Sequence, residues 1–134
     1  MGSLDENPKC ARTYASFRLI GDTQVIADIG TRTGLSSDGV NEARRKTVWW
    51  ISSENRIETT SLERHLRLLL DIVEPRSDAL IPLIETGEVS ADFFCLWRSA
   101  DGDGGPEVSP ETLARIAALD AALGLDFYSD ADGD

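Results

Sequence analysis

The chain has 134 residues and a formal net charge of −11 at pH 7, which is long enough for one domain with a hydrophobic core. A uniformly acidic surface repels phosphate backbones, so we expect no nucleic-acid partner. No apolar run approaches the length that spans a bilayer, and residues 1–8 lack the basic start and the apolar region of a signal peptide. Cys10 and Cys95 are the two cysteines, which argues against a disulfide framework and favours a cytoplasmic location without a membrane partner.

The first half of the chain predicts a strand, a short helix and a second strand after a flexible leader over residues 1–13. Residues 14–20 alternate apolar and polar side chains, as a half-buried strand does. A short helix follows and stops at Gly30. Residues 31–46 are long for a structureless loop, which leaves room for a further short strand. Residues 47–52 are rich in β-branched and aromatic side chains and predict the second strand.

The clearest amphipathic helix lies at the centre of the chain, over residues 60–75. Its leucines recur at helical spacing and form one apolar stripe. Thr60 and Glu63 have the spacing of a capping box, in which a hydroxyl and a carboxylate satisfy free backbone N–H groups at the helix start. Pro75 disfavours helical geometry at the preceding residue and ends or bends the helix there.

The second half repeats the plan of the first. A helix is expected over residues 76–86 and a strand over 91–98. A further helix begins at Ser109, with Pro110 in its first turn, and is closed by Gly124. A last strand over residues 125–128 and an acidic tail over 129–134 complete the chain.

Two such halves favour a ferredoxin-like α+β sandwich, in which two βαβ units are joined by the central helix. Helices on one face would cover an antiparallel or mixed sheet of about four strands. The sequence therefore predicts a single α+β domain over residues 14–128.

The order of several motifs resembles a known family. The stretches are 14–22, 50–53, 65–76, 104–111 and 123–128. Together they are similar to the bacterial domain of unknown function 4279 family, from about Tyr14 to Tyr128. Family members typically carry a Leu-Gly…Pro-Thr stretch and a Lys-Gly after the first helix, whereas residues 29–33 are shorter and lack that proline. The family carries no established activity, so the resemblance implies the fold and leaves the function open.

His65, the single histidine, is the first candidate for a functional residue. It lies beside the apolar stripe of the central helix, and Asp22 or Asp126 could serve as its partner. A single histidine beside an apolar stripe is more often packed at the helix edge than catalytic. No nucleophile is evident nearby in the sequence, which also favours the structural interpretation.

The sequence predicts no metal site and no cofactor. The run Asp101-Gly102-Asp103-Gly104 invites a calcium interpretation, but Gly105, Pro106 and Thr112 stand where that motif needs an oxygen ligand, glycine and glutamate. Two distant cysteines and one histidine make no zinc constellation, and no phosphate-binding glycine-rich loop is present.

A surface of aromatic and basic residues is the second candidate for a functional site. Arg18, Trp49 or Trp50, and Arg98 are expected to emerge on the uncovered face of the sheet. The adjacent tryptophans must point to opposite faces, so one of them lies in the core. We name Arg18, Trp49, Trp50, Arg98 and His65 as candidate binding residues and name no catalytic residue.

The leading hypothesis is a small, non-catalytic protein-binding module with a basic protein partner, for example an immunity-type protein that neutralises a basic toxin. One alternative is a small-molecule-binding or hydrolytic enzyme that uses His65 with nearby carboxylates; it predicts a concave pocket around His65. Another alternative is a structural homo-oligomer, such as a homodimer joined through the sheet.

Overall fold

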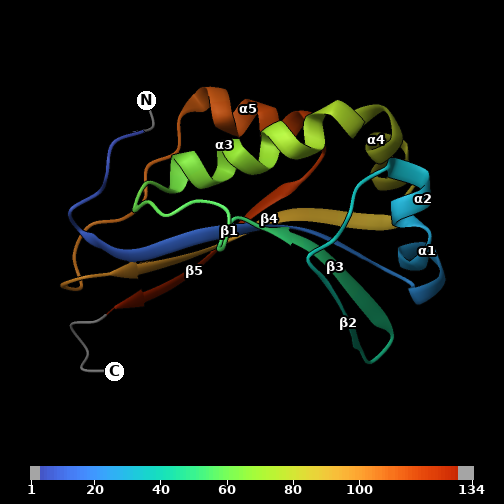
Figure 1. Ribbon diagram of the computed structural model, residues 1–134, viewed down its shortest axis with the longest axis horizontal. Coiled ribbons are helices and arrows are strands. Elements are labelled where there is room, and N and C mark those ends of the chain that lie inside the picture. Colours follow the sequence, from blue (N-terminus) through green and yellow to red (C-terminus); the bar gives the residue numbers. More distant parts are fainter. Residues whose placement is uncertain (1–3, 130–134) are drawn as a thin grey trace.

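The strands of the computed structural model, which describes residues 4–129, form one mixed sheet (Figure 1). Their order across the sheet is β2-β3-β1-β4-β5, and only β4 and β5 run parallel to each other. The sequence predicted about four strands, whereas the sheet has five. The strands are β1 (Cys10–Gly21), β2 (Gly39–Ala43), β3 (Lys46–Ser52), β4 (Val89–Ser99) and β5 (Ala122–Ser129).

Helices cover one face of this sheet and leave the other face open (Figure 1). The core lies between the two layers, and its aromatic centre is Phe17 on β1. The ring centroid of Phe17 is 5.1 Å from that of Phe93 and 6.4 Å from that of Trp49. The fold is therefore α+β, as predicted. The helices are α1 (Thr23–Ala27), α2 (Ile29–Thr33), α3 (Leu62–Val73), α4 (Ser77–Glu85) and α5 (Pro110–Ala118), with a 3-10 turn (Glu74–Arg76) between α3 and α4.

The central strand β1 is longer than predicted. It begins at Cys10, so residues 10–13, which the prediction assigned to a flexible leader, belong to the sheet. Thr13 is buried, and its hydroxyl donates a hydrogen bond to the Leu96 carbonyl at 2.7 Å. The backbone N–H of Asn7 also donates to the Thr60 hydroxyl at 2.8 Å. Of the predicted acidic tail, Ser129 ends β5 and residues 130–134 lie outside the described residues.

The last helix and strand also differ from the prediction. Helix α5 ends at Ala118, and the chain turns through Asp120 with a φ of 57°. Aspartate adopts this left-handed conformation more readily than most residues, so no glycine is needed there. Gly124, predicted to close the helix, lies instead within β5 opposite Phe94. A Cβ atom at this glycine would lie 3.2 Å from the Phe94 ring, so the missing side chain leaves room for the ring.

Helix α3 begins one residue later than the capping-box pattern predicted. Ser61 is the N-cap, and its side chain accepts a hydrogen bond from the Arg64 N–H. The buried Glu63 carboxylate turns instead toward the start of α5, where it accepts from the backbone N–H of Ser109 at 2.8 Å and from the hydroxyls of Ser109 and Thr112. Burial alone would raise the pKa of Glu63, but these hydrogen bonds outweigh it and lower the pKa. Glu63 therefore joins the two helices.

Candidate functional site

The open face of the sheet brings together three of the predicted binding residues. On β1, Ala15, Phe17 and Leu19 are buried beneath the helices, so Arg18 points to the opposite face. Trp50 on β3 is the direct register partner of Arg18. Arg98 points to the same face from the exposed end of β4. Trp49 is 3% exposed and lies in the core, as one of the two adjacent tryptophans had to.

Arg18 is held rigidly at the centre of this face. Its Nε and Nη2 atoms donate to the two carboxylate oxygens of Asp92 on β4, at 2.8 and 2.6 Å. Its guanidinium carbon lies 4.4 Å from the ring centroid of Phe94, which is a cation–π geometry. The hydrogen bonds that Arg18 donates to Asp92 raise the pKa of Arg18 above its ordinary value. The guanidinium is therefore a fixed planar surface whose charge is balanced by its neighbour.

The Trp50 ring lies against Gly39 of β2, on the strand next to this arginine. An added Cβ atom at Gly39 would lie only 2.2 Å from Cζ2 of Trp50, so the indole occupies the space above the glycine. Gly39 is the register partner of Trp50 in the hairpin formed by β2 and β3. The tryptophan is half-buried and keeps part of its ring at the surface.

A second group of aromatic and arginine side chains follows at the other end of the face. The guanidinium of Arg12 lies 5.4 Å from the ring centroid of Tyr14 and pairs with Glu54 at 2.5 Å. Arg98 is the register partner of Tyr128 on β5, whose hydroxyl donates to Asp126 at 2.8 Å. The open face therefore combines Trp, Tyr, Phe and Arg side chains, and two of its arginines lie over aromatic rings.

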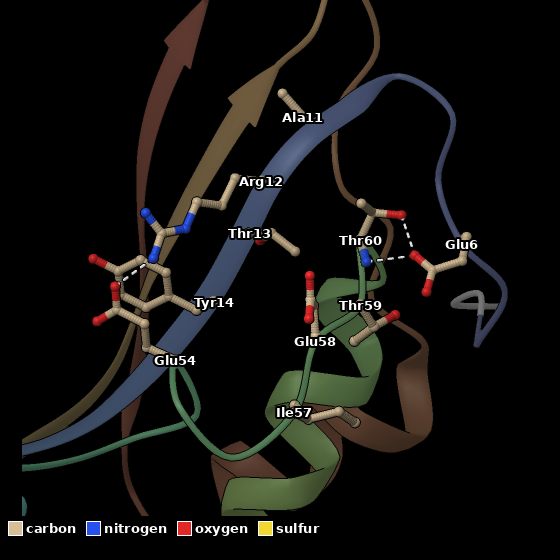
Figure 2. A pocket seen from close by; sticks show the side chains of 10 residues that line it. All are labelled: Glu6, Ala11, Arg12, Thr13, Tyr14, Glu54, Ile57, Glu58, Thr59 and Thr60. Atoms are coloured by element: carbon tan, nitrogen blue, oxygen red, sulfur yellow. Dashed lines mark hydrogen bonds and ion pairs between the residues drawn. The ribbon is translucent and has the colours of Figure 1, made fainter.

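A polar pocket of about 630 Å³ opens at the margin of this face, between the start of β1 and the loop that follows β3 (Figure 2). Two of its carboxylates are engaged: Glu54 by Arg12, and Glu6 by the N–H and hydroxyl of Thr60. The hydrogen bonds from Thr60 lower the pKa of Glu6, which keeps this group ionised and unsuited to act as a general acid. The pocket is lined by Glu6, Ala11, Arg12, Thr13, Tyr14, Glu54, Ile57, Glu58, Thr59 and Thr60.

His65 is packed inside the protein and does not line this pocket. Its side chain is 1% exposed, with Nε2 2.9 Å from the carbonyl oxygen of Thr59 and Nδ1 2.7 Å from the hydroxyl of Ser53. A carbonyl can only accept, so Nε2 carries the proton and Nδ1 accepts from Ser53. Burial lowers the pKa of His65, which keeps the ring neutral at pH 7. Both ring nitrogens are thus used in holding the loop before α3.

The carboxylates proposed as partners of His65 lie elsewhere. Asp22 is near Lys46, at 3.9 Å, and Asp126 accepts from Tyr128. Asp101 and Asp103 pair with Lys9 at 3.2 and 3.5 Å.

Within residues 4–129, no group of three or more His, Cys, Asp or Glu residues is placed to hold a metal ion. In the same part of the chain, no helix has the length and apolar character needed to cross a bilayer.

The sequence interpretation missed several members of the open face. Asp92 and Phe94 fix the orientation of Arg18, and Tyr14 and Tyr128 carry the second aromatic group. For the β1 and β4 residues the signal was present, because alternation along each strand assigns every second side chain to the face of Arg18. The pairing of Arg18 with Asp92 depends on the register between β1 and β4, which alternation alone does not supply.

The chain belongs to the family described as Domain of unknown function (DUF4279), which it matches over residues 11–130. No curated protein and no solved structure matches the chain significantly.

Proposed function

We propose that this protein, whose family has no assigned activity, is a non-catalytic protein-binding module. Its open sheet face docks a protein partner. The observation that carries the proposal is the gathering of Arg18, Trp50 and Arg98 with Tyr14 and Phe94 on a face that no helix within residues 4–129 covers. Trp, Tyr and Arg are the residue types that contribute most binding energy at protein interfaces.

The face is already ordered for binding. Arg18 is fixed by two hydrogen bonds and a ring contact, and Trp50 is fixed over Gly39. Side chains that are held in place lose little conformational entropy when a partner binds. The contacts of Arg18 also occupy the polar atoms that a catalysed reaction would need. The arrangement therefore supports a docking surface more than an active site.

The partner we propose is a basic protein. The net charge of −11 attracts a basic molecule over long distances and speeds its encounter. Two arginines of the face do not oppose this attraction, because Arg18 is paired with Asp92 and Arg12 with Glu54. An immunity-type protein that neutralises a basic toxin in the cytoplasm is one concrete form of this function.

The fold supports a more specific architecture as well. Strands β1 to β4 lie in the order β2-β3-β1-β4, and every neighbouring pair is antiparallel. We propose that these strands and their helices form a ferredoxin-like unit, and that α5 and β5 extend it beyond β4.

The test compares two substitutions of equal size. Arg98→Ala removes a side chain from the open face, whereas Arg45→Ala alters the turn between β2 and β3, outside that face. Both remove one positive charge, so their long-range effect on a basic partner is the same. Partners captured from native lysate by the wild-type protein are identified by mass spectrometry, purified and titrated against both variants at low and high salt. We expect a basic partner that binds less tightly at high salt, with affinity reduced at least tenfold by Arg98→Ala and not reduced by Arg45→Ala. Equal binding by the two variants would overturn the assignment of the face.

A further inference from the structure

The exposed apolar side chains of residues 4–129 gather on one strand. Seven large hydrophobic side chains in this part of the chain are exposed, and four of them lie on β5. Leu123 is 42% exposed, Leu125 49% and Phe127 46%. Their register partners on β4 are buried beneath the helices. The helical layer therefore stops short of β5 and leaves three apolar side chains half-covered on the same side of the strand.

Strand β5 is also a border of the sheet, with no strand paired to its outer edge among the described residues (Figure 1). Its eight residues include a single charged one, Asp126, which points to the open face and accepts from Tyr128. The opposite border, β2, has only five residues and is followed by Arg44, Arg45 and Lys46. Short length and positive charge protect an edge from pairing, so β2 is protected and β5 is not.

The sequence of β5 is complementary to itself in one antiparallel register. Two copies of a strand that pair edge to edge are related by a two-fold axis perpendicular to the sheet, and this axis must pass beside one residue of each copy. With Leu125 at the axis, the two Leu125 side chains lie opposite each other and Leu123 lies opposite Phe127. Asp126 then faces Gly124 of the second copy. With Asp126 at the axis, two carboxylates would lie directly opposite each other, which is unfavourable.

We propose that β5 is the interface of a homodimer, in which it pairs antiparallel with β5 of a second copy about an axis at Leu125. The dimer has a continuous ten-stranded sheet with both helical layers on the same side. It covers the apolar side chains of β5 and gives a strand partner to its outer edge, which no strand within residues 4–129 pairs. A second copy suits this edge better than a basic partner, because apolar side chains line it and its one carboxylate is engaged by Tyr128.

The homodimer does not depend on the proposed binding of a basic partner. The two interactions should respond to added salt in opposite directions, so salt distinguishes them. Each copy carries a net charge of −11, so two copies repel each other. Added salt screens that repulsion and strengthens the dimer. The same salt weakens the binding of a basic partner to the open face. Either surface can therefore fail its test while the other passes.

The first experiment measures the molar mass by light scattering over a wide concentration range. We expect the wild-type protein to change from monomer to dimer as its concentration rises, at a lower concentration in high salt. Leu125→Lys should remain a monomer, while Val40→Lys, an equivalent change on the other border strand, should dimerise like the wild type. Circular dichroism of each variant verifies the fold. A wild-type protein that stays monomeric throughout, or a dimer that tolerates Leu125→Lys, would overturn the proposal.

The second experiment tests the register by oxidative cross-linking. Leu125→Cys places two thiols opposite each other at the axis, so we expect a covalent dimer on a denaturing gel. In this register the two copies of Leu123→Cys lie four residues apart along the strands, about 13 Å, and should not cross-link. Cys95 is the register partner of Leu125 on β4, so both variants also carry Cys95→Ala, which prevents a disulfide within one copy. The protein with Cys95→Ala alone is the background control. Cross-linking of Leu123→Cys in preference to Leu125→Cys would refute the register.

Discussion

At the scale of single residues, His65 shows how a chemically reactive side chain becomes a structural one. Its two ring nitrogens bridge Ser53 and Thr59, while Ser53 also bonds the backbone of Ala15 on β1. The histidine therefore ties the start of α3 to the central strand through a serine. Burial lowers the pKa of His65 and favours the neutral imidazole, in which Nε2 donates to the Thr59 carbonyl and Nδ1 accepts from the Ser53 hydroxyl.

This arrangement predicts a loss of stability in mild acid. The pKa of His65 in the folded protein is lowered below 6.5, so below that pH the unfolded chain takes up a proton that the folded protein resists. We expect the free energy of unfolding to fall as the pH drops below about 6.5. Urea unfolding at a series of pH values measures this free energy. Since the chain has one histidine, His65→Gln should flatten this dependence, and an unchanged slope would contradict the prediction.

Glu63 predicts a second single-residue effect. Glu63→Gln replaces a buried acceptor of three hydrogen bonds with an amide whose N–H₂ group faces donors. We expect a loss of about 1.5–3 kcal/mol in unfolding free energy, the usual range for hydrogen bonds to a charged group. Glu111→Gln, on the exposed side of α5, is the matched control and should change stability by less than about 0.5 kcal/mol. Equal effects of the two substitutions would contradict the role of Glu63.

At the scale of elements, the pairing of β2 with β3 depends on the contact between Gly39 and Trp50. Gly39→Ala places a methyl group where the indole now lies, so Trp50 must move or β2 must separate. We expect a loss of about 1–3 kcal/mol and a shift in tryptophan fluorescence. Gly105→Ala is the control, because an added Cβ atom there meets nothing within 4 Å. Unfolding curves that coincide for the two variants would disprove the importance of this contact.

The same strand shows which elements a sequence can predict. The apolar stripe of α3 and the alternation of β1 follow from local periodicity, and both were found. Residues 39–43 contain one large apolar side chain, Val40, so they form a strand through their pairing with β3 rather than through a local pattern. The burial of His65 likewise depends on the path of residues 53–60, which brings Ser53 and Thr59 to its ring. Contacts of this kind are invisible to periodicity.

At the scale of the whole molecule, β5 completes the sheet by a parallel pairing that α5 makes possible. A chain ending at Asp120 would keep β2-β3-β1-β4 but would expose the outer edge of β4, a long strand rich in aromatic residues. We expect this truncated chain to aggregate, since such edges are templates for further strands. A chain ending at Ser129 keeps β5 and should stay soluble. Light scattering at matched concentrations compares them, and a soluble, folded chain ending at Asp120 would contradict the prediction.

The position of β5 in the chain has a consequence for biosynthesis. A ribosome makes the four antiparallel strands before it makes β5, so β4 emerges without the neighbour that covers its outer edge. Until β5 follows, the nascent chain presents that edge to every other chain nearby, and adjacent ribosomes on one messenger hold such chains close together. The interval between the emergence of β4 and that of β5 is therefore the stage at which we expect this protein to need a chaperone most.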